Sequence, residues 1–310
     1  MNKVISVIIP AYNEEQNLPL LTEKLYRLFE RLPYSLELIF INDGSRDKSL
    51  DVLKQLSNQY NNLFYIDFSR NFGQQNALRA GYDYSSGDAV ICMDADLQNP
   101  PEVVEELIHK WEEGFEVVVC KRRGAVQNAG AFKESTSRAF YRLMSFLTDI
   151  PVEPNSPDFR LIDRKLVNVI KDLNEKDIFF RGLISWMGFK KAVVEYDHSV
   201  RLHGETKYSL QKMIKLASSG LTSFSVKPLH LAMYLGLIIS SLSLLYIPYA
   251  FISYFRGETI SGWASLIVTV AFFGGLQLLI LGVIGMYLGK LFMQSKQRPE
   301  YIVRETNLRN

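Results

Sequence analysis

The sequence predicts an α/β fold with a mostly parallel sheet, followed by a membrane anchor near the C-terminal end. Three observations predict this fold: short apolar runs alternate with helix-like stretches, polar segments follow several of these runs, and two long uncharged runs come late in the chain. Alternating strands and helices form parallel sheets with helices on both faces. The chain has 310 residues, which is enough for one sizeable domain and an additional segment.

The predicted strands are four apolar runs in the first third of the chain. Each has the length and the continuous apolar character of a strand that is buried on both faces of a parallel sheet. These runs are VISVII at 4–9, LELIFI at 36–41, LFYIDF at 63–68 and AVICM at 89–93.

Helices are predicted between these strands, because apolar residues recur there at helical spacing. Leu21 and Leu25 mark the first helix, and Leu53 lies in the second. We expect Ser45 to cap the second helix. A third helix is predicted over 76–84, and the sequence Ser-Ser-Gly ends it.

Two long runs near the C-terminal end contain no charged residue, one from Leu231 to Phe255 and the other from Thr259 to Gly289. Each exceeds the roughly 20 residues that span a bilayer. Lysine and arginine residues flank the outer ends of both runs, which places both termini in the cytoplasm and the short connection outside. The alternative, a buried helical hairpin in a soluble protein, fits two such runs poorly.

Composition gives little further indication of function. The net charge of +2 gives no reason to expect nucleic acid as a partner. Cys92 and Cys120 both lie in apolar runs, and we expect two buried free thiols. The N-terminal apolar run is too short for a signal peptide and stops at Pro10.

The segment DADLQ follows the fourth predicted strand. Asp94 and Asp96 are two residues apart, so in an extended chain they share a face with Gln98, with the small Ala95 between them. Oxygen-bearing side chains in this arrangement are suited to a hard divalent cation. The alternative is a solvated turn before the two prolines, since Asp is a common turn residue.

Two other strands end in polar segments, PAYNEE and NDGS. Ligands of parallel sheets bind beyond the carboxyl ends of the strands. We therefore expect these two segments and DADLQ to converge on one cleft.

The polar segments resemble the motifs of the family 2 glycosyltransferases. More narrowly, they look like those of polyprenyl-phosphate glycosyltransferases of the bactoprenol glucosyltransferase and dolichol-phosphate mannose synthase type. The resemblance covers nearly the whole chain, including the two uncharged runs. It is carried by IPAYNEE (9–15), INDGSRD (41–47), SRNFGQQNAL (69–78), MDADLQNPPE (93–102), PDFRLIDR (157–164), RGLISWMGF (181–189), RLHGETKYSL (201–210) and RPEYIV (298–303).

This resemblance implies a membrane-anchored, GT-A-like, Rossmann-type enzyme that transfers a sugar to polyprenyl phosphate with inversion. Glucose from UDP-glucose is our first choice, and mannose or a modified arabinose are alternatives. A processive polysaccharide synthase is less suitable, because the chain lacks the Gln-x-x-Arg-Trp segment of those enzymes. A membrane-tethered nucleotide-sugar binder without activity is the non-enzyme alternative. Relatives form tetramers, so the resemblance also implies a homo-oligomer.

The predicted organisation has four parts. A cytoplasmic GT-A-like catalytic domain occupies 1–207, an amphipathic juxtamembrane segment 208–228, a two-helix transmembrane anchor 229–293 and a cytoplasmic tail 294–310. The resemblance and the anchor together predict a multi-pass protein of the cell membrane with its catalytic domain in the cytoplasm.

The resemblance assigns the nucleotide sugar to residues at the strand ends. It implies that Asp94, Asp96 and Gln98 hold Mn²⁺ or Mg²⁺, and that Asp96 takes part in catalysis. For Glu14 the alternative is a favourable charge at a helix N-terminus. The family usually has an acid where this chain has Asn42. The implied nucleotide-sugar set is Pro10, Tyr12, Glu14, Ile41, Asp43, Asp94, Ala95 and Arg122.

The acceptor phosphate is assigned to Arg122, Arg138, Arg201 and Lys207, which match basic positions of the family's motifs. Arginine can hold a phosphate through two hydrogen bonds, and lysine acts as a point charge. The alternative for each is a solvated surface charge.

Asp158 is the predicted catalytic base, because the family carries an acid there in the motif Gly-Asp-Phe-Arg. This chain has Pro157 in place of the glycine, which changes the backbone freedom of the loop. The alternative is that Asp158 pairs with Arg160 or Arg164 and only shapes the loop.

Overall fold

The computed structural model describes residues 3–123, 157–176, 178–197, 226–256 and 262–308. These residues form two compact units. The described residues between 3 and 197, together with 299–308, form the catalytic unit, and those between 226 and 298 form the helical unit.

The catalytic unit is built around a mixed sheet with the strand order β7-β5-β6-β4-β1-β2-β3-β8. Its centre is parallel, because β1 pairs in parallel with β2 and β4, and β2 with β3. The β6 strand is antiparallel to both β4 and β5, and β8 is antiparallel to β3. The strands are β1 (Val4–Ala11), β2 (Ser35–Asn42), β3 (Leu63–Phe68), β4 (Ala89–Cys92), β5 (Val117–Arg122), β6 (Arg160–Asp163), β7 (Lys191–Tyr196) and β8 (Val303–Thr306).

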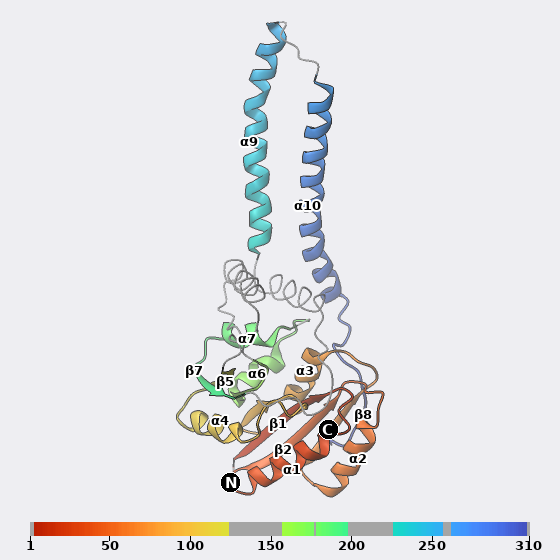
Figure 1. Cartoon of the computed structure of the whole chain (residues 1–310), viewed down its shortest axis with the longest axis vertical. Coiled ribbons are helices and arrows are strands. Elements are labelled where there is room, and N and C mark those ends of the chain that lie inside the picture. Colours follow the sequence, from red (N-terminus) through yellow and green to blue (C-terminus); the bar gives the residue numbers. More distant parts are fainter. Residues whose placement is uncertain (1–2, 124–156, 177, 198–225, 257–261, 309–310) are drawn as a thin grey trace. The chain divides into compact units, whose positions relative to one another are not determined.

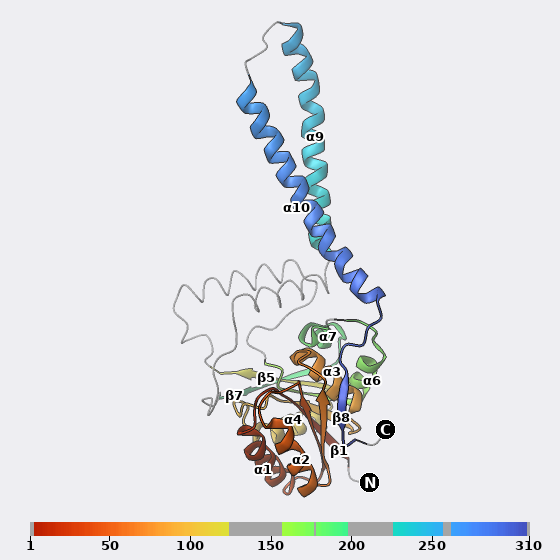
Figure 2. The same cartoon turned by 90° about the vertical axis from the view of Figure 1, so that its right-hand side faces the viewer.

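Helices cover both faces of this sheet (Figures 1 and 2). Apolar residues of α1, α2 and α4 join one buried cluster with Ile5, Val7 and Ile9 of β1. On the opposite face α3 lies close to Ile8 and Ile41. The helices of the catalytic unit are α1 (Asn17–Phe29), α2 (Ser49–Gln59), α3 (Gln74–Tyr84), α4 (Val103–Glu112), α6 (Arg164–Asp172) and α7 (Phe180–Trp186).

The four strands and three helices predicted from the apolar pattern are confirmed. The expected cap of the second helix is wrong, because α2 begins at Ser49 and is preceded by Lys48. The hydroxyl of Ser45 instead donates to Asn42 Oδ1 and accepts from the backbone N–H of Asn13. Ser45 therefore joins loops and does not cap the helix.

The C-terminal segment folds with the catalytic unit. The β8 strand lies along the edge of β3 (Figure 2). Just before it, the ring of Tyr301 stacks on Phe68 at 5.0 Å between ring centroids, and its hydroxyl donates to Asp83 Oδ2 at 2.8 Å. The predicted tail at 294–310 thus contributes a strand to the sheet.

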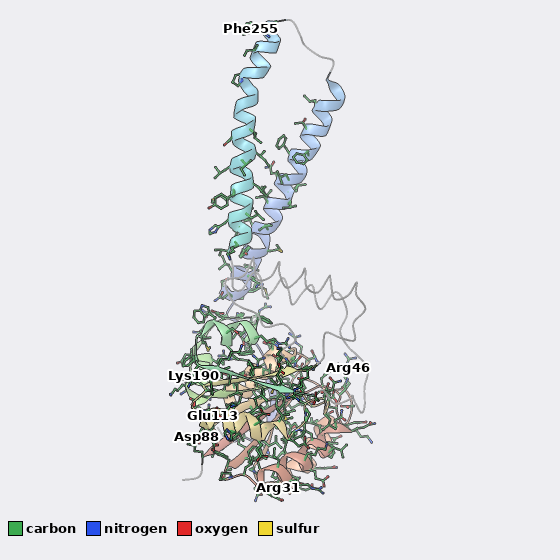
Figure 3. The ribbon with its side chains drawn as sticks, turned by 60° about the vertical axis from the view of Figure 1, so that its left-hand side comes forward. Arg31, Arg46, Asp88, Glu113, Lys190 and Phe255 are labelled. Atoms are coloured by element: carbon green, nitrogen blue, oxygen red, sulfur yellow. The ribbon has the colours of Figure 1, made fainter. Side chains whose placement is uncertain are left out.

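The helical unit contains α9 (Lys227–Phe255) and α10 (Trp263–Ser295). Within the part of the chain that the structure describes, one helical segment, Phe272–Ser295, is long and apolar enough to cross a membrane. In α9 the apolar segment Leu229–Ile239 is shorter, so the predicted multi-pass topology is not supported by the described residues. Phe255 ends α9 with 81% of its surface exposed (Figure 3).

Gly44 provides a test of the packing between two loops. It has a φ of +65°, and a Cβ atom there would lie 2.4 Å from the carbonyl carbon of Arg70. Gly114 has a φ of +89° with no atom within 4 Å of such a Cβ, so it isolates the backbone cost. We expect Gly114→Ala to lower the free energy of unfolding by about 1 kcal/mol and Gly44→Ala by at least twice that. Thermal denaturation of both variants measures the difference, and equal losses would contradict the predicted clash.

Candidate active site

The loops that follow β1 and β2 are joined by hydrogen bonds. The backbone N–H of Asn13 donates to Ser45 Oγ at 2.9 Å, and Arg46 N donates to Asn13 Oδ1 at 2.8 Å. The N–H of Glu14 donates to Ser49 Oγ at 2.9 Å. Asn13 has a φ of 56°, a left-handed conformation that asparagine tolerates well. The PAYNEE and NDGS segments are therefore adjacent, as the sequence predicts.

Several residues predicted to bind the nucleotide lie in or beside these loops. Pro10, Tyr12 and Glu14 are partly buried. The carboxylate of Glu14 accepts a hydrogen bond from Asn17 Nδ2 at 2.6 Å, at the start of α1. Ile41 is fully buried, and its side chain lies near α3, so a ligand would reach its backbone and not its side chain.

Asp43 holds the loop before α3. Its carboxylate accepts hydrogen bonds from the backbone N–H groups of Phe72 at 2.6 Å and Gly73 at 2.9 Å. Burial raises the pKa of Asp43, while these two N–H groups and the charge of Arg70 act in the opposite direction. The observed contacts make Asp43 an anchor of the loop that leads to Gln74, the first residue of α3.

The segment that carries Asp94 and Asp96 is not extended, so the argument from a shared strand face is wrong. The β4 strand ends at Cys92. Leu97 has a φ of 59°, and the backbone N–H of Gln98 donates to Asp96 Oδ1 at 3.2 Å. A turn, and not a strand, therefore places the polar side chains.

Asp94 lies at the centre of the site. It is partly buried and accepts hydrogen bonds from Gln74 Nε2 at 3.0 Å and Asn99 Nδ2 at 3.4 Å. Burial, together with the negative charges of Asp158 and Asp96, raises its pKa to about 6. Three carboxylates from two distant segments therefore share one site. Ala95, between the two acids of the turn, is buried.

Asp158 is buried and contacts two arginines. Arg160 Nη2 donates to its Oδ1, and Arg181 donates from Nε to Oδ1 at 3.1 Å and from Nη2 to Oδ2 at 3.2 Å. Burial alone would raise the pKa of Asp158. The charges of Arg181 and Arg160 and the hydrogen bonds from Arg181 and Gln75 outweigh burial and hold this pKa below its usual value.

The second arginine of the alternative considered for Asp158 is used elsewhere. Arg164 donates from Nε to the carbonyl of Gly87 at 2.6 Å and from Nη1 to that of Ser85 at 3.1 Å. Asp158 thus pairs with Arg160, as that alternative proposed, and with Arg181, which the sequence analysis did not consider.

A second hydrogen-bonded chain connects Asp94 to Arg122 at the end of β5. Arg122 Nε donates to the hydroxyl of Tyr196 at 3.3 Å, and this hydroxyl donates to Asn99 Oδ1 at 3.0 Å. The Nδ2 group of Asn99 then donates to Asp94. Burial raises the pKa of Tyr196, so the hydroxyl stays protonated and able to donate.

Five residues of this site were not predicted from the sequence: Gln74, Gln75, Asn99, Arg181 and Tyr196. The two glutamines lie in the SRNFGQQNAL motif and Arg181 begins RGLISWMGF, so a signal was present for these three. Asn99 is next to the acidic turn. Tyr196 had no signal, because only the pairing of β7 with β5 brings it near Arg122.

The acidic pair is suited to a divalent cation that is shared with a substrate. No cluster of three or more His, Cys, Asp or Glu side chains fit for a metal ion occurs among the described residues. Mg²⁺, however, is usually held by one or two carboxylates together with phosphate oxygens of the substrate. Asp94 and Asp96 lie close enough for the charge of Asp96 to raise the pKa of Asp94, and a cation would relieve this repulsion. The predicted third ligand, Gln98, is partly exposed in the same turn.

Three predicted acceptor residues, Arg138, Arg201 and Lys207, lie outside the described residues, as does 208–225 of the predicted juxtamembrane segment.

Comparisons with known proteins place this chain in a class of enzymes. Residues 6–170 match the family model described as glycosyl transferase family 2. An uncharacterized glycosyltransferase of Bacillus subtilis is 46% identical, over 97% of this chain and 93% of its own. The bactoprenol glucosyl transferase of Shigella phage SfV is 40% identical, over 97% of this chain and 98% of its own.

The site and these matches define a glycosyltransferase. The chain belongs to glycosyltransferase family 2, which confirms the resemblance seen in its motifs. Among solved structures, glucosyl-3-phosphoglycerate synthase from Mycobacterium tuberculosis is similar at a TM-score of 0.47 and 22% identity, over 71% of this chain and 78% of its own. That likeness is too distant to bear on substrate or mechanism.

The raised pKa of Asp94 predicts a pH-dependent cost to stability. Its value of about 6 exceeds the ordinary 3.8, so the fold disfavours the ionised form. The cost is absent below about pH 4, grows between about pH 4 and pH 6 as the unfolded chain ionises first, and is constant at higher pH. Without metal, we expect Asp94→Asn to be more stable than the wild type at pH 7.5, on the order of 2 kcal/mol, with a gain that shrinks toward pH 5.

Thermal unfolding with chelator present measures this gain. The exposed Asp51 in the first turn of α2 is the control, because Asp51→Asn should not stabilise the protein at any pH. A pH-independent gain for Asp94→Asn would contradict the assignment of its pKa.

Proposed function

We propose that the protein transfers glucose from UDP-glucose to a polyprenyl phosphate at the cytoplasmic face of the cell membrane, with inversion at the anomeric carbon. The observation that carries the proposal is the group of three acids, Asp94, Asp96 and Asp158, beside the carboxyl ends of the parallel strands. Relatives named bactoprenol glucosyl transferase, similar over almost their full length, support the choice of sugar and acceptor.

The donor would bind across the joined loops after β1 and β2 and the acidic turn. In this proposal the loop residues Pro10, Tyr12, Glu14 and Asp43 and the backbone of Ile41 form the nucleotide side. Asp94 and Asp96, with Gln98, would hold Mn²⁺ or Mg²⁺. When bound, this ion stabilises the negative charge that develops on the diphosphate leaving group.

The hydrogen bonds around Asp94 support its role as a ligand of the cation. Gln74 and Asn99 donate to the two oxygens of Asp94 and so fix the carboxylate in one orientation. Tyr196 links Asn99 to Arg122, whose guanidinium would lie near the donor phosphates or the acceptor phosphate. An ordered carboxylate loses less entropy when a cation binds than a free one does.

The lipid acceptor would be held by basic residues near the membrane. We propose Arg122, Arg138, Arg201 and Lys207 for its phosphate, because charge-assisted hydrogen bonds to phosphate are strong. We also propose that 208–228 is an amphipathic interfacial segment and that both uncharged runs cross the bilayer. The support is the absence of charge from Leu231 to Phe255 and from Thr259 to Gly289. A homo-oligomer, which the family resemblance implies, remains a prediction.

The contacts of Asp158 favour a positioning role over that of a base. Its depressed pKa makes it a weak proton acceptor, and both of its oxygens already accept hydrogen bonds from arginine. A phosphate nucleophile is already anionic near neutral pH. We therefore propose that Asp158 orients Arg160 and Arg181, and keep the base as the alternative to be tested.

The first test is a transfer assay. Purified protein in detergent should move labelled glucose from UDP-glucose to undecaprenyl phosphate when Mn²⁺ or Mg²⁺ is present, and should stop in excess chelator. Asp96→Asn should lose most activity, about a hundredfold or more, because one of two carboxylates for the cation is neutral. Arg201→Ala or Lys207→Ala should raise the KM for the lipid and leave that for UDP-glucose unchanged.

A donor panel in the same assay separates the alternatives. Faster transfer from a mannose or arabinose donor would change the sugar but not the reaction. Full turnover in excess chelator would contradict the proposed dependence on a divalent metal ion. Binding of nucleotide sugars with no transfer to any lipid phosphate would favour the non-catalytic binder.

The role of Asp158 can be read from the pH dependence of Asp158→Asn. If Asp158 positions the two arginines, Asp158→Asn should lower kcat by about tenfold or more at every pH between 6 and 9, because the two guanidinium groups lose their counter-charge. As a base, its loss should matter less above pH 7, where the acceptor phosphate is a dianion. Turnover of wild type and variant with saturating metal and lipid distinguishes the two, and a mutant as active as wild type at pH 6.5 would refute both.

A further inference from the structure

The segment that follows α10 is tied to β3 by many contacts. Ser69 N donates to the carbonyl of Ile302 at 3.0 Å, beside the β8 strand. Tyr65 N donates to Asn307 Oδ1 at 2.8 Å, and Thr306 Oγ1 donates to the carbonyl of Tyr65 at 2.7 Å. Ile302, Thr306 and Asn307 lie beyond the part of the chain that the family model matches, which ends at residue 170.

One side chain of this segment reaches a buried acid. Arg304 Nε donates to Asp67 Oδ2 at 2.6 Å. The side chain of Asp67 is fully buried, while that of Arg304 is about half exposed. A buried carboxylate is costly unless a cation or hydrogen bonds compensate it. Arg304 therefore supplies a charge that the interior of the sheet requires.

The other oxygen of Asp67 faces the loops that follow β1 and β2. Asn42 Nδ2 donates to Asp67 Oδ1 at 2.7 Å. On its other side, Asn42 Oδ1 accepts from both the hydroxyl and the backbone N–H of Ser45. Ser45 Oγ in turn accepts from the N–H of Asn13 at 2.9 Å. Each link has one donor and one acceptor, so the anionic Asp67 fixes the orientation of the amide of Asn42.

This series of hydrogen bonds also accounts for the asparagine at position 42. An acid there would place a second carboxylate against the buried Asp67, about a hydrogen-bond length away, and like charges at that distance repel. An amide at position 42 can donate to Asp67 and accept from Ser45 at the same time. Asn42, Asp67 and Arg304 thus form a matched set from three separate parts of the sequence.

We propose that Arg304 is a positioning residue for the nucleotide-sugar site. Through Asp67 and Asn42 it holds Ser45 and Asn13, and with them the two loops on which the donor would bind. The inference rests on the proposed function, because it assumes that a nucleotide diphosphate sugar binds there. If Arg304 has this role, the nucleotide-sugar site is complete only when the segment that follows α10 is in place.

The test compares two ion pairs between the same strand and the rest of the unit. Arg304→Ala removes the pair to Asp67. The matched control is Lys54→Ala, which removes an exposed ion pair between Lys54 Nζ and Glu305 Oε2 at 2.7 Å. In the full-length protein with Mn²⁺, we expect Arg304→Ala to weaken UDP-glucose binding about tenfold and Lys54→Ala to change it less than twofold. Isothermal titration measures both.

Steady-state kinetics give a readout that a general loss of stability would not produce. Arg304→Ala should raise the KM for UDP-glucose and leave the KM for undecaprenyl phosphate unchanged. Arg304→Lys should recover part of the affinity, because it keeps the charge. Asp67→Asn combined with Arg304→Ala should weaken binding less than the sum of the two single effects.

The possible results separate the two proposals. If Arg304→Ala binds UDP-glucose within twofold of the wild type, or if Lys54→Ala weakens binding equally, Arg304 does not position the donor site. If the wild-type protein binds none of the nucleotide sugars in a panel, the proposed function itself is wrong, and the inference is lost with it.

Discussion

The repulsion among Asp94, Asp96 and Asp158 is the constraint on which the rest of the catalytic unit depends. When three acids lie together beside the ends of buried strands, burial and their mutual repulsion disfavour both the ionisation of their carboxyl groups and folding, unless hydrogen-bond donors surround them. The structure meets this need in two ways. Amide groups of Gln74 and Asn99 contact Asp94, while two arginines contact Asp158. Burial and the neighbouring acids raise the pKa of Asp94 to about 6, whereas the arginines hold the pKa of Asp158 below its usual value, so these acids are suited to different tasks.

The sequence was sufficient for the parallel core, because continuous apolar runs such as 36–41 have one stable place, the interior of a covered sheet. It was also sufficient for the closeness of Asp94 and Asp96, although not for the turn that places them, and for the approach of the first two loops. It was insufficient where long-range pairing decides the result. Tyr196 and Arg181 reach the site only through strands and helices far from the acidic turn, and β8 has four residues with no apolar pattern.

Local geometry limited the prediction as well. The acids at positions 94 and 96 were placed together on the assumption of an extended chain, but a left-handed residue, Leu97, turns the backbone there. Ser45 has the composition of a helix cap and joins two loops instead, since Asn42 and Asn13 offer it better partners than the start of α2. In both cases side-chain hydrogen bonds to neighbouring loops outweigh the local preference of the residue.

The position of β8 after both long helices has a consequence for biosynthesis. Ribosomes make β3 and its buried Asp67 early, but the strand that covers the edge of β3 is made more than two hundred residues later, after both long helices. Until then the edge of β3 has unpaired backbone groups, a surface prone to pairing with other chains. The catalytic unit therefore cannot finish folding before both long helices have been synthesised.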